Sequence, residues 1–290
     1  MMSTRPAGHP PVDSLLYPKA SASCASSSWT LPAPELKRSG KPRISIQLSE
    51  PYRCLSWAVH GGGFQTVREL LWLQVTNSDL SEKVCPRAFI AAQLQENRSD
   101  EEAARDNGLD NDKAKGVAFD QTVFLTSARL ESYREFRVIR EGIEVIAVAT
   151  VGLGNALRAG DPESRMGTSR TINLACLVNV SMTDNAMLEA LSIMTEAKTA
   201  AILEAGILSK QSGFRATGTG TDCQAVLCPI GFDHDYAGKH TVLGRVIGEA
   251  SLAAINLGIT AWQEWQEHHR TKTDPSGPDG SRPERRERRQ

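Results

Sequence analysis

The clearest pattern of apolar and polar positions along the chain is a series of short runs rich in β-branched residues. Two long runs cover residues 143–151 and 171–179, and a third begins at Cys223. Apolar runs of this length predict strands that are buried on one or both faces. Earlier in the chain, the alternation at 43–49 and the segment 52–59 predict two paired strands joined by a proline-containing turn.

The region between these strands predicts further short elements. Residues 64–71 have the pattern of a short helix, and 72–75 that of a strand. Segments 117–126 and 135–140 read as strands that lead into the run at 143–151. Consecutive strands joined by short turns form a meander, so we expect a sheet that is at least partly antiparallel.

The longest helical pattern lies between Ser181 and Gly206. Ser181-Met-Thr-Asp is a capping signature, and Gly206 provides the stop. At about 100° per residue, one apolar stripe results; its members are Met187, Leu188, Leu191, Met194, Ala201, Ile202 and Ala205. Lys198 lies within this stripe, whereas Glu189 and Glu196 lie on the opposite face. A lysine directed into a packed face needs a partner or a polar cavity, whereas one at the edge of the stripe reaches water; both interpretations stay open.

Two other helices complete the expected fold. One is predicted over residues 81–95, with a proline near its first turn. The other is predicted over 240–257 and closed by Gly258, with a short helical extension that carries two tryptophans. The predicted class is α+β: a single domain with a mixed, largely antiparallel sheet and helices packed over it.

Composition sets the domain boundaries. With 290 residues and 40% hydrophobic content, the chain can form a full core. Residues 1–40 are rich in Pro, Ser and Ala and are predicted to be a disordered tail, as is the charged segment 268–290. The domain between them, residues 41–267, carries a polar segment at 96–116 that we expect to be a loop insertion.

The charge balance limits the range of partners. A net charge of −1 argues against nucleic acid or an anionic membrane as the main partner. No apolar run reaches the ~18 residues of a membrane helix, and the N-terminus lacks the apolar core of a secretory signal. The six cysteines form no Cys-x-x-Cys pair, which favours buried free thiols in a reducing cytoplasm. The spacing of Gly244 and Gly248 is compatible with a homodimer.

Three glycine-rich segments lie at strand ends, where backbone amides can approach a ligand closely. The segment at 60–63 is similar to a lipase oxyanion loop, but the chain has no Gly-x-Ser-x-Gly elbow. In the segment at 152–161, the third glycine of a dinucleotide fingerprint would fall at Leu157. The segment at 216–222 lacks the Gly-Lys-Ser/Thr of a phosphate-binding loop.

Taken together, these segments resemble one family. The residues that carry the resemblance occur in a fixed order over about residues 43–260: Leu55-Ser-Trp-Ala-Val-His-Gly-Gly62, Val151-Gly-Leu-Gly-Asn-Ala-Leu-Arg-Ala-Gly-Asp161, Thr171-Ile-Asn173, Thr195-Glu-Ala-Lys-Thr-Ala-Ala201, Ala216-Thr-Gly-Thr-Gly-Thr-Asp222 and Tyr236-Ala-Gly-Lys-His-Thr-Val-Leu-Gly244. They resemble the adenosylcobinamide amidohydrolase (CbiZ) family. The family usually has Asn-Gly-Gly where this chain has His60-Gly-Gly.

The resemblance implies an amidase of corrinoid salvage. It would cleave the amide between the corrin ring and the aminopropanol arm of adenosylcobinamide and release adenosylcobyric acid. The corrinoid is then a small-molecule substrate and no cofactor is expected. Two other functions stay open: a corrinoid-binding protein without catalysis, and an amidase that acts on another substrate.

Amide hydrolysis needs an activated nucleophile, donors for the oxyanion and an acid for the leaving amine. The candidate catalytic residues are Asp222, Lys198, Thr221, His240 and Glu196. Asp222 is a candidate base, and Lys198 could lower the pKa of a hydroxyl or protonate the amine. The candidate substrate-binding residues are Ser56, His60, Gly61, Gly62, Asn155, Arg158, Asp161, Asn173, Thr217 and Thr219. The hydroxyls of Thr217, Thr219 and Thr221 could each act as the nucleophile or bind substrate amides.

Two questions about the mechanism stay open. The sequence does not decide between a covalent route and direct attack by water. No metal site is assigned, because the spacing of Asp161, Asp222, Asp233, His234, Asp235 and His240 matches no known ligand pattern, and metal dependence is left open.

Overall fold

The computed structural model describes residues 35–37, 41–81, 83–105, 121–163 and 171–273, which belong to one compact unit. Within them the main sheet has eight strands: β1 (Glu35–Lys37), β2 (Arg43–Ser56), β3 (Gly63–Gln74), β4 (Gln121–Thr126), β5 (Arg134–Arg140), β6 (Ile143–Val151), β8 (Ile172–Val178) and β10 (Cys223–Pro229). A small second sheet consists of β7 (Ala156–Leu157) and β9 (Gly218–Thr219). The helices are α1 (Pro86–Arg105), α2 (Asp184–Glu204), α3 (Val242–Thr273) and the short 3-10 helix η1 (Leu130–Ser132).

The strand order is β4-β3-β2-β10-β8-β6-β5, with β1 beside β2. The pairs β3–β4 and β8–β10 are parallel, and the other neighbouring pairs of this sheet are antiparallel. The predicted α+β class with a mixed, largely antiparallel sheet is therefore confirmed.

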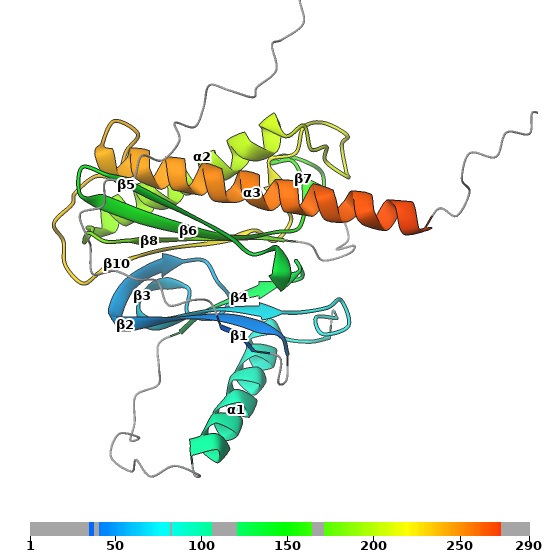
Figure 1. Ribbon diagram of the computed structural model, residues 1–290, viewed down its shortest axis with the longest axis horizontal. Coiled ribbons are helices and arrows are strands. Elements are labelled where there is room, and N and C mark those ends of the chain that lie inside the picture. The colour runs from blue at the N-terminus through cyan, green and yellow to red at the C-terminus, as the bar shows by residue number, and fades with distance from the viewer. Residues whose placement is uncertain (1–34, 38–40, 82, 106–120, 164–170, 274–290) are drawn as a thin grey trace, which may run out of the picture. The chain divides into compact units, whose positions relative to one another are not determined.

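The sheet bends so that its two halves form separate layers (Figure 1). The register between β2 and β3 is irregular between Gln47 and Tyr52, and irregularities of this kind bend a strand. As a result β4 lies across from β8, and Asn173 Nδ2 donates a hydrogen bond to the carbonyl oxygen of Leu125 at 2.9 Å. Helix α1 packs on the outer side of β3 and β4 through Ile90.

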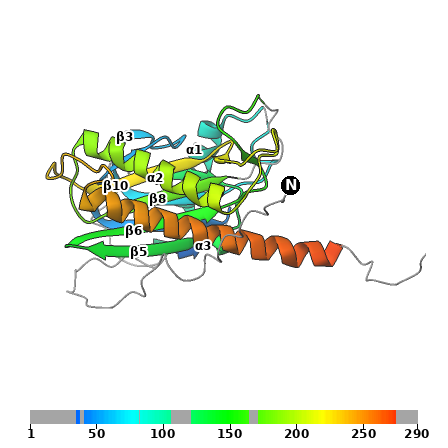
Figure 2. The same ribbon diagram turned by 90° about the horizontal axis from the view of Figure 1, so that it is seen from above.

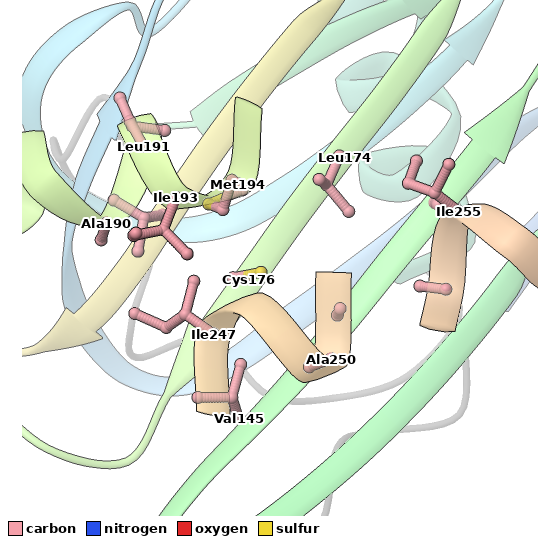
Figure 3. Close-up of a cluster of buried hydrophobic side chains, with 14 of the residues drawn as sticks. Val145, Leu174, Cys176, Ala190, Leu191, Ile193, Met194, Ile247, Ala250 and Ile255 are labelled. Carbon is pink, nitrogen blue, oxygen red and sulfur yellow. The ribbon is translucent and has the colours of Figure 1, made fainter. Parts of the chain in front are cut away.

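Helices α2 and α3 lie side by side over the other half of the sheet (Figure 2). Their apolar side chains meet those of β6 and β8 in the main core, as Figure 3 shows for Ile193 and Met194 of α2 and Ile247 of α3 around Cys176. At Gly258, a Cβ atom would lie 2.4 Å from Val151 Cγ2, so glycine lets α3 approach β6 closely. This core fixes α2, which carries the site described below.

The predicted end of helix α2 at Gly206 is confirmed, but the predicted cap at Ser181 is wrong, because Ser181 Oγ donates to Asp233 Oδ2 at 2.5 Å instead. Thr183 is the N-cap, its side chain accepts a hydrogen bond from the amide of Ala186, and Gly206 follows the helix with a φ of 72°. The predicted apolar stripe is correct in its main members but wrong for Leu188, whose side chain is exposed, whereas Ile193 is buried. The difference arises because α2 packs on both the sheet and α3, so the residues that it buries face two neighbouring elements rather than one.

Some local predictions are wrong. Residues 35–37, predicted to lie in a disordered tail, form strand β1, which pairs with β2. Segments 43–49 and 52–59 are not two paired strands but parts of one irregular strand, β2. Residues 64–71 are not helical, because β3 is paired along its length with β2 and also with β4. The segment 96–116 is not wholly a loop, since α1 continues to Arg105 and the rest lies outside the described residues.

A further correction concerns α3, which does not end at Gly258 but continues to Thr273, into the region predicted to be a disordered tail. By length and composition, α3 is the one helix among the described residues that qualifies as a membrane span, over Val242–His269. More than half of that apolar window, 61%, is buried against the rest of the protein. Its packing on β5, β6 and α2 is that of a core helix.

Candidate active site

Two glycine-rich segments that are distant in the sequence meet in the structure. Strands β7 and β9 pair antiparallel, with Ala156 opposite Thr219 and Leu157 opposite Gly218. The amide of Thr217 also donates to the carbonyl oxygen of Leu157 at 2.9 Å. Two of the three glycine-rich segments singled out from the sequence therefore lie side by side.

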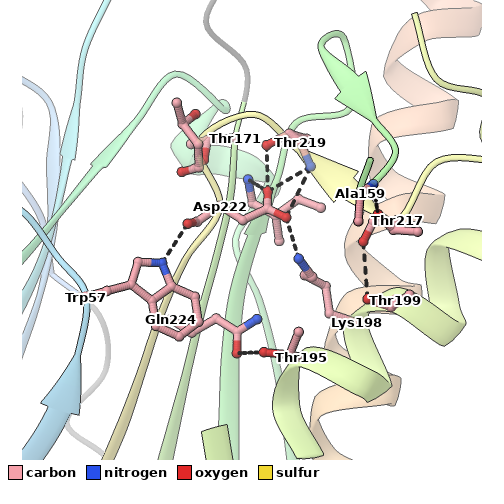
Figure 4. Close-up of polar contacts among 12 residues, drawn as sticks. Trp57, Ala159, Thr171, Thr195, Lys198, Thr199, Thr217, Thr219, Asp222 and Gln224 are labelled. Carbon is pink, nitrogen blue, oxygen red and sulfur yellow. Dashed lines mark hydrogen bonds and ion pairs between the residues drawn. The ribbon is translucent and has the colours of Figure 1, made fainter. Parts of the chain in front are cut away.

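Lys198 and Asp222 form an ion pair beneath these segments (Figure 4). Lys198 projects from α2, and Asp222 immediately precedes β10. Their side chains are 8% and 10% exposed, respectively. Of the two interpretations of Lys198, the structure therefore supports the one in which a buried ammonium has a partner.

The carboxylate of Asp222 is held by a short turn. The amide of Thr219 lies 3.1 Å from both carboxylate oxygens, and Thr219 Oγ1 donates to Oδ1 at 2.5 Å. The amide of Ile172, at the start of β8, reaches Oδ1 from the other side at 3.3 Å. Backbone and side-chain donors together fix the carboxylate where β8, β9 and β10 converge.

Gly218 is required by this arrangement. A Cβ atom at residue 218 would lie 2.2 Å from Asp222 Oδ2 and 2.9 Å from Lys198 Nζ, so a side chain would displace the ion pair. At Gly220 the corresponding atom would lie 3.2 Å from the flexible end of Leu157 and 3.5 Å from Asn155 Nδ2. A side chain would therefore displace the ion pair at residue 218 but can be accommodated at residue 220, although both glycines belong to the same segment.

The three threonines of this segment have different environments. Thr219 contacts the carboxylate, as described. Thr217 Oγ1 accepts a hydrogen bond from the amide of Ala159 at 2.9 Å and so connects the two segments. Thr221 is exposed, and its carbonyl oxygen accepts a hydrogen bond from Thr171 Oγ1 at 2.7 Å. Only Thr219 has its hydroxyl on the Asp222 carboxylate.

An open cavity of about 660 Å³ lies at the turn between β2 and β3. Ser56, His60, Gly61 and Gly62 line it, all of which were predicted to bind substrate. Trp57 also lines the cavity, and its Nε1 donates to the backbone oxygen of Asp222 at 2.8 Å (Figure 4). Trp57, which directly follows β2, thus contacts both the cavity and the backbone of Asp222.

Two candidate catalytic residues lie apart from the ion pair. Glu196 is exposed and forms an ion pair with Lys239, and His240 is exposed beside Gly238. Within the described residues neither has a hydrogen bond or ion pair with Asp222 or Lys198. The sequence could place both near the site but could not show which groups their side chains face.

Three candidate binding residues have contacts within the protein. Arg158 Nη1 donates to the carbonyl oxygen of Arg215 at 2.9 Å. Asp161 accepts hydrogen bonds from Ser209 Oγ at 2.5 Å and from the Arg158 amide at 2.8 Å, and the serine contact is the main cause that lowers the pKa of the Asp161 carboxyl. Asn173 is buried at the interface of β8 and β4. These contacts stabilise the loops around the site.

The thiol nearest the ion pair is that of Cys223. Burial is the main cause that raises its pKa to about 12, so the sulfur is protonated at neutral pH and is a poor nucleophile. Three other described cysteines, Cys54, Cys176 and Cys228, are buried free thiols, as predicted, whereas Cys85 is exposed. Among the described residues, no cluster of three or more His, Cys, Asp or Glu side chains is arranged to hold a metal ion.

Three residues that lie close to the ion pair were not predicted from the sequence as site residues. Trp57 was noted only as part of a motif, and its contact with Asp222 depends on the pairing of β2 with β10. Gln224 and Thr195 were not singled out, although Thr195 Oγ1 lies 3.2 Å from Gln224 Oε1 directly below the ion pair (Figure 4). The alternation of β10 would have indicated that Gln224 faces α2.

A carboxylate that accepts a hydrogen bond from a hydroxyl and is paired with a buried ammonium can act as a general base toward that hydroxyl. Comparison with known families gives the class: a hydrolase that acts on amide bonds. The profile described as adenosylcobinamide amidohydrolase (CbiZ) matches residues 31–267, and the chain belongs to that family.

One curated relative is an uncharacterized protein of Methanocaldococcus jannaschii. It is 32% identical over 154 residues, which are 45% of this chain. The match spans 59% of the length of that relative.

Solved structures with a similar fold include two peptidases. The L-aminopeptidase D-Ala-esterase/amidase of Ochrobactrum anthropi has a TM-score of 0.38 and 11% identity, over 79% of this chain and 82% of that protein. The β-aminopeptidase of a Burkholderia species has the same scores and coverage.

Proposed function

We propose that this protein hydrolyses the amide between the corrin ring and the aminopropanol arm of adenosylcobinamide, giving adenosylcobyric acid and the free amine. The family assignment supports an amidohydrolase of cobinamide processing. One observation carries the chemistry: the Asp222 carboxylate accepts a hydrogen bond from the Thr219 hydroxyl at 2.5 Å while it is paired with the Lys198 ammonium.

The proposed first step is attack by Thr219. Its Oγ1 forms a bond to the amide carbon while its proton passes to Asp222, which has the geometry of a general base. The ammonium of Lys198 stabilises the negative charge that develops on the carbonyl oxygen. The C–N bond then breaks, the leaving nitrogen takes the proton from Asp222, and an ester remains on Thr219.

The second step consumes water. A water molecule gives its proton to Asp222 as its oxygen attacks the ester carbon. The bond to Thr219 Oγ1 breaks, and Asp222 returns the proton to that oxygen. The sum is one amide and one water converted to one carboxylic acid and one amine, with the protein unchanged.

The open cavity is the proposed site of the corrin ring. Trp57 lines this cavity and donates a hydrogen bond to the backbone oxygen of Asp222, so we place the side arm of the bound ring along Trp57 toward the ion pair. At Gly61 and Gly62 the wall of the cavity consists of backbone without side chains, which allows close approach by a large substrate.

A direct test is incubation of the purified protein with adenosylcobinamide, followed by separation of the corrinoids on a reversed-phase column. We expect adenosylcobyric acid from the native protein and from Glu204→Gln, a control on the exposed part of α2. We expect none from Asp222→Asn with an unchanged circular dichroism spectrum. Binding of the corrinoid without cleavage by folded native protein would overturn the amidase and favour a corrinoid-binding protein.

A further inference from the structure

The imidazole of His60 lies on the wall of the open cavity, in the turn between β2 and β3. The side chain is half-buried, and among the described residues neither ring nitrogen has a hydrogen-bond or ion-pair partner. Burial lowers the pKa of this imidazole below its usual value of 6.5. At neutral pH the ring is therefore uncharged, and a ring nitrogen is available as a ligand without breaking a contact to any described residue.

The backbone that carries His60 is rigidly placed. Its carbonyl oxygen accepts a hydrogen bond from the amide of Val123 in β4 at 3.1 Å. The next carbonyl, of Gly61, accepts one from Thr122 Oγ1 at 3.0 Å.

The two following glycines allow this close packing. A Cβ atom on Gly61, which has a φ of 70°, would lie 2.0 Å from the carbonyl oxygen of Gln121. On Gly62 it would lie 2.3 Å from that of Ala58. Side chains are therefore excluded at both positions, and the loop can be held against β4. A ligand-binding atom at residue 60 is thus positioned before any ligand arrives.

The rest of the wall combines apolar surface with polar groups. Trp57, Val59 and Leu94 supply apolar surface, while Gln65, Arg87 and Gln121 supply polar groups. Trp57 and Val59 are 49% and 44% exposed to solvent, so their apolar side chains are available for contact with a ligand. In a corrinoid the ring offers the apolar face, its carboxamide arms offer hydrogen bonds, and cobalt lies at the centre.

We propose that His60 is an axial ligand of the cobalt in the bound corrinoid. This inference rests on the proposed function, because it assigns the corrinoid to the same cavity. The step is a ligand exchange: a Co–N bond to the imidazole forms, the Co–O bond to the axial solvent molecule breaks, and no electron is transferred. Neutral imidazole is a common protein ligand of transition metals.

Ligation fixes the position of the ring relative to the ion pair. A Co–N bond fixes the centre and tilt of the macrocycle against the wall, and the turn from Trp57 to His60 joins that wall to Asp222. The position from which the amide-bearing arm extends toward Thr219 is then fixed. His60 is in this respect a positioning residue rather than a catalytic one.

The test is electron paramagnetic resonance of cob(II)inamide bound to the full-length protein. We expect each cobalt line to split into three by one 14N nucleus, and into two when the protein is labelled with 15N. His60→Asn and His60→Gln, which keep a polar side chain of similar reach, lose the splitting. His268→Ala, which removes an exposed histidine on α3, keeps it.

Equilibrium dialysis and turnover in the same samples separate this inference from the proposed function. Bound cob(II)inamide without nitrogen splitting, or splitting that survives in both His60 variants, overturns the ligation, whether or not adenosylcobinamide is cleaved. Splitting without cleavage leaves the ligation in place and overturns the amidase. No binding of cobinamide to folded protein overturns both.

Discussion

Lys198 Nζ and Asp222 Oδ2 are paired across the junction of α2 and β10, although they are 24 residues apart in the chain. The ammonium is there because the apolar face of α2 packs on the sheet and takes Lys198 with it. The carboxylate is there because Thr219 and Ile172 hold it with backbone amides. The pair is therefore built by the core itself, and its removal has consequences for stability as well as for chemistry.

The first prediction concerns the stability of the ion pair. Lys198→Met leaves a buried carboxylate without its partner and should lower the free energy of unfolding by about 3 kcal/mol. The double variant Lys198→Met/Asp222→Leu should lose clearly less, since neither charge then remains buried. Lys210→Met, on an exposed lysine, should change stability by less than about 0.5 kcal/mol. Urea titrations measure all three; equal losses in the single and double variants would contradict the pairing.

The second prediction compares two neighbouring glycines. Gly218→Ala should abolish turnover, because its Cβ atom would fall 2.2 Å from Asp222 Oδ2 and force the carboxylate away. Gly220→Ala should retain most of the activity, because the flexible end of Leu157 can move by a few tenths of an ångström. Turnover of adenosylcobinamide and thermal melting are measured together. Equal activity of the two folded variants would argue against a catalytic role for the carboxylate.

The third prediction assigns the nucleophile among the threonines. Thr219→Val should lower kcat by about 100-fold or more, since it removes the hydroxyl on the carboxylate. Thr219→Ser should recover much of the loss, and Thr221→Val should have little effect. If Thr219→Val keeps its activity, water attacks the amide directly and Asp222 acts on that water.

The fourth prediction concerns the cysteines. Backbone amides of Ala88 and Arg87 lower the pKa of the exposed Cys85 thiol, the Ala88 contact being the larger cause, whereas the pKa of Cys223 is about 12. Because the thiolate is the reactive form, iodoacetamide at pH 7.5 should label Cys85 well before Cys223. Tryptic mass spectrometry follows the labelling. In Cys85→Ser, the reagent should leave turnover unchanged; rapid labelling of Cys223 with loss of activity would indicate a cysteine nucleophile.

The parts of the fold with a strong local pattern were predictable. The runs that became β6 and β8 are largely apolar because they are covered on both faces, and α2 lies between its predicted capping segment and Gly206. Helical periodicity also placed Lys198 within the apolar stripe, because the position of a residue on a helix follows from its spacing, but whether its ammonium is buried depends on the partner Asp222.

Other parts depend on contacts that local sequence does not encode. Residues of β3 such as Glu69 and Leu70 suit a helix, but pairing with β2 and β4 makes them a strand. Gly258 has the appearance of a helix stop, yet it lies within α3 where the helix crosses Val151. Such outcomes are set by tertiary packing, which overrides local propensity.

The candidate site shows the same division. Its two glycine-rich segments and the residues Lys198 and Asp222 could be singled out from the sequence. Which of three alternating threonines faces the carboxylate could not, because that depends on the turn from Thr219 to Asp222. The cavity could not be predicted either, since β2, β3, β4 and α1 together form its wall.

The central claim is that this protein hydrolyses a corrinoid amide with Asp222 and Lys198. The most direct measurement is incubation of adenosylcobinamide with the native protein in water enriched in 18O, with both products analysed by mass spectrometry. We expect adenosylcobyric acid that carries one 18O atom in its new carboxylate, an equal amount of aminopropanol, and neither product with Asp222→Asn. Absence of these products from folded native protein, or their undiminished formation by folded Asp222→Asn, would contradict it.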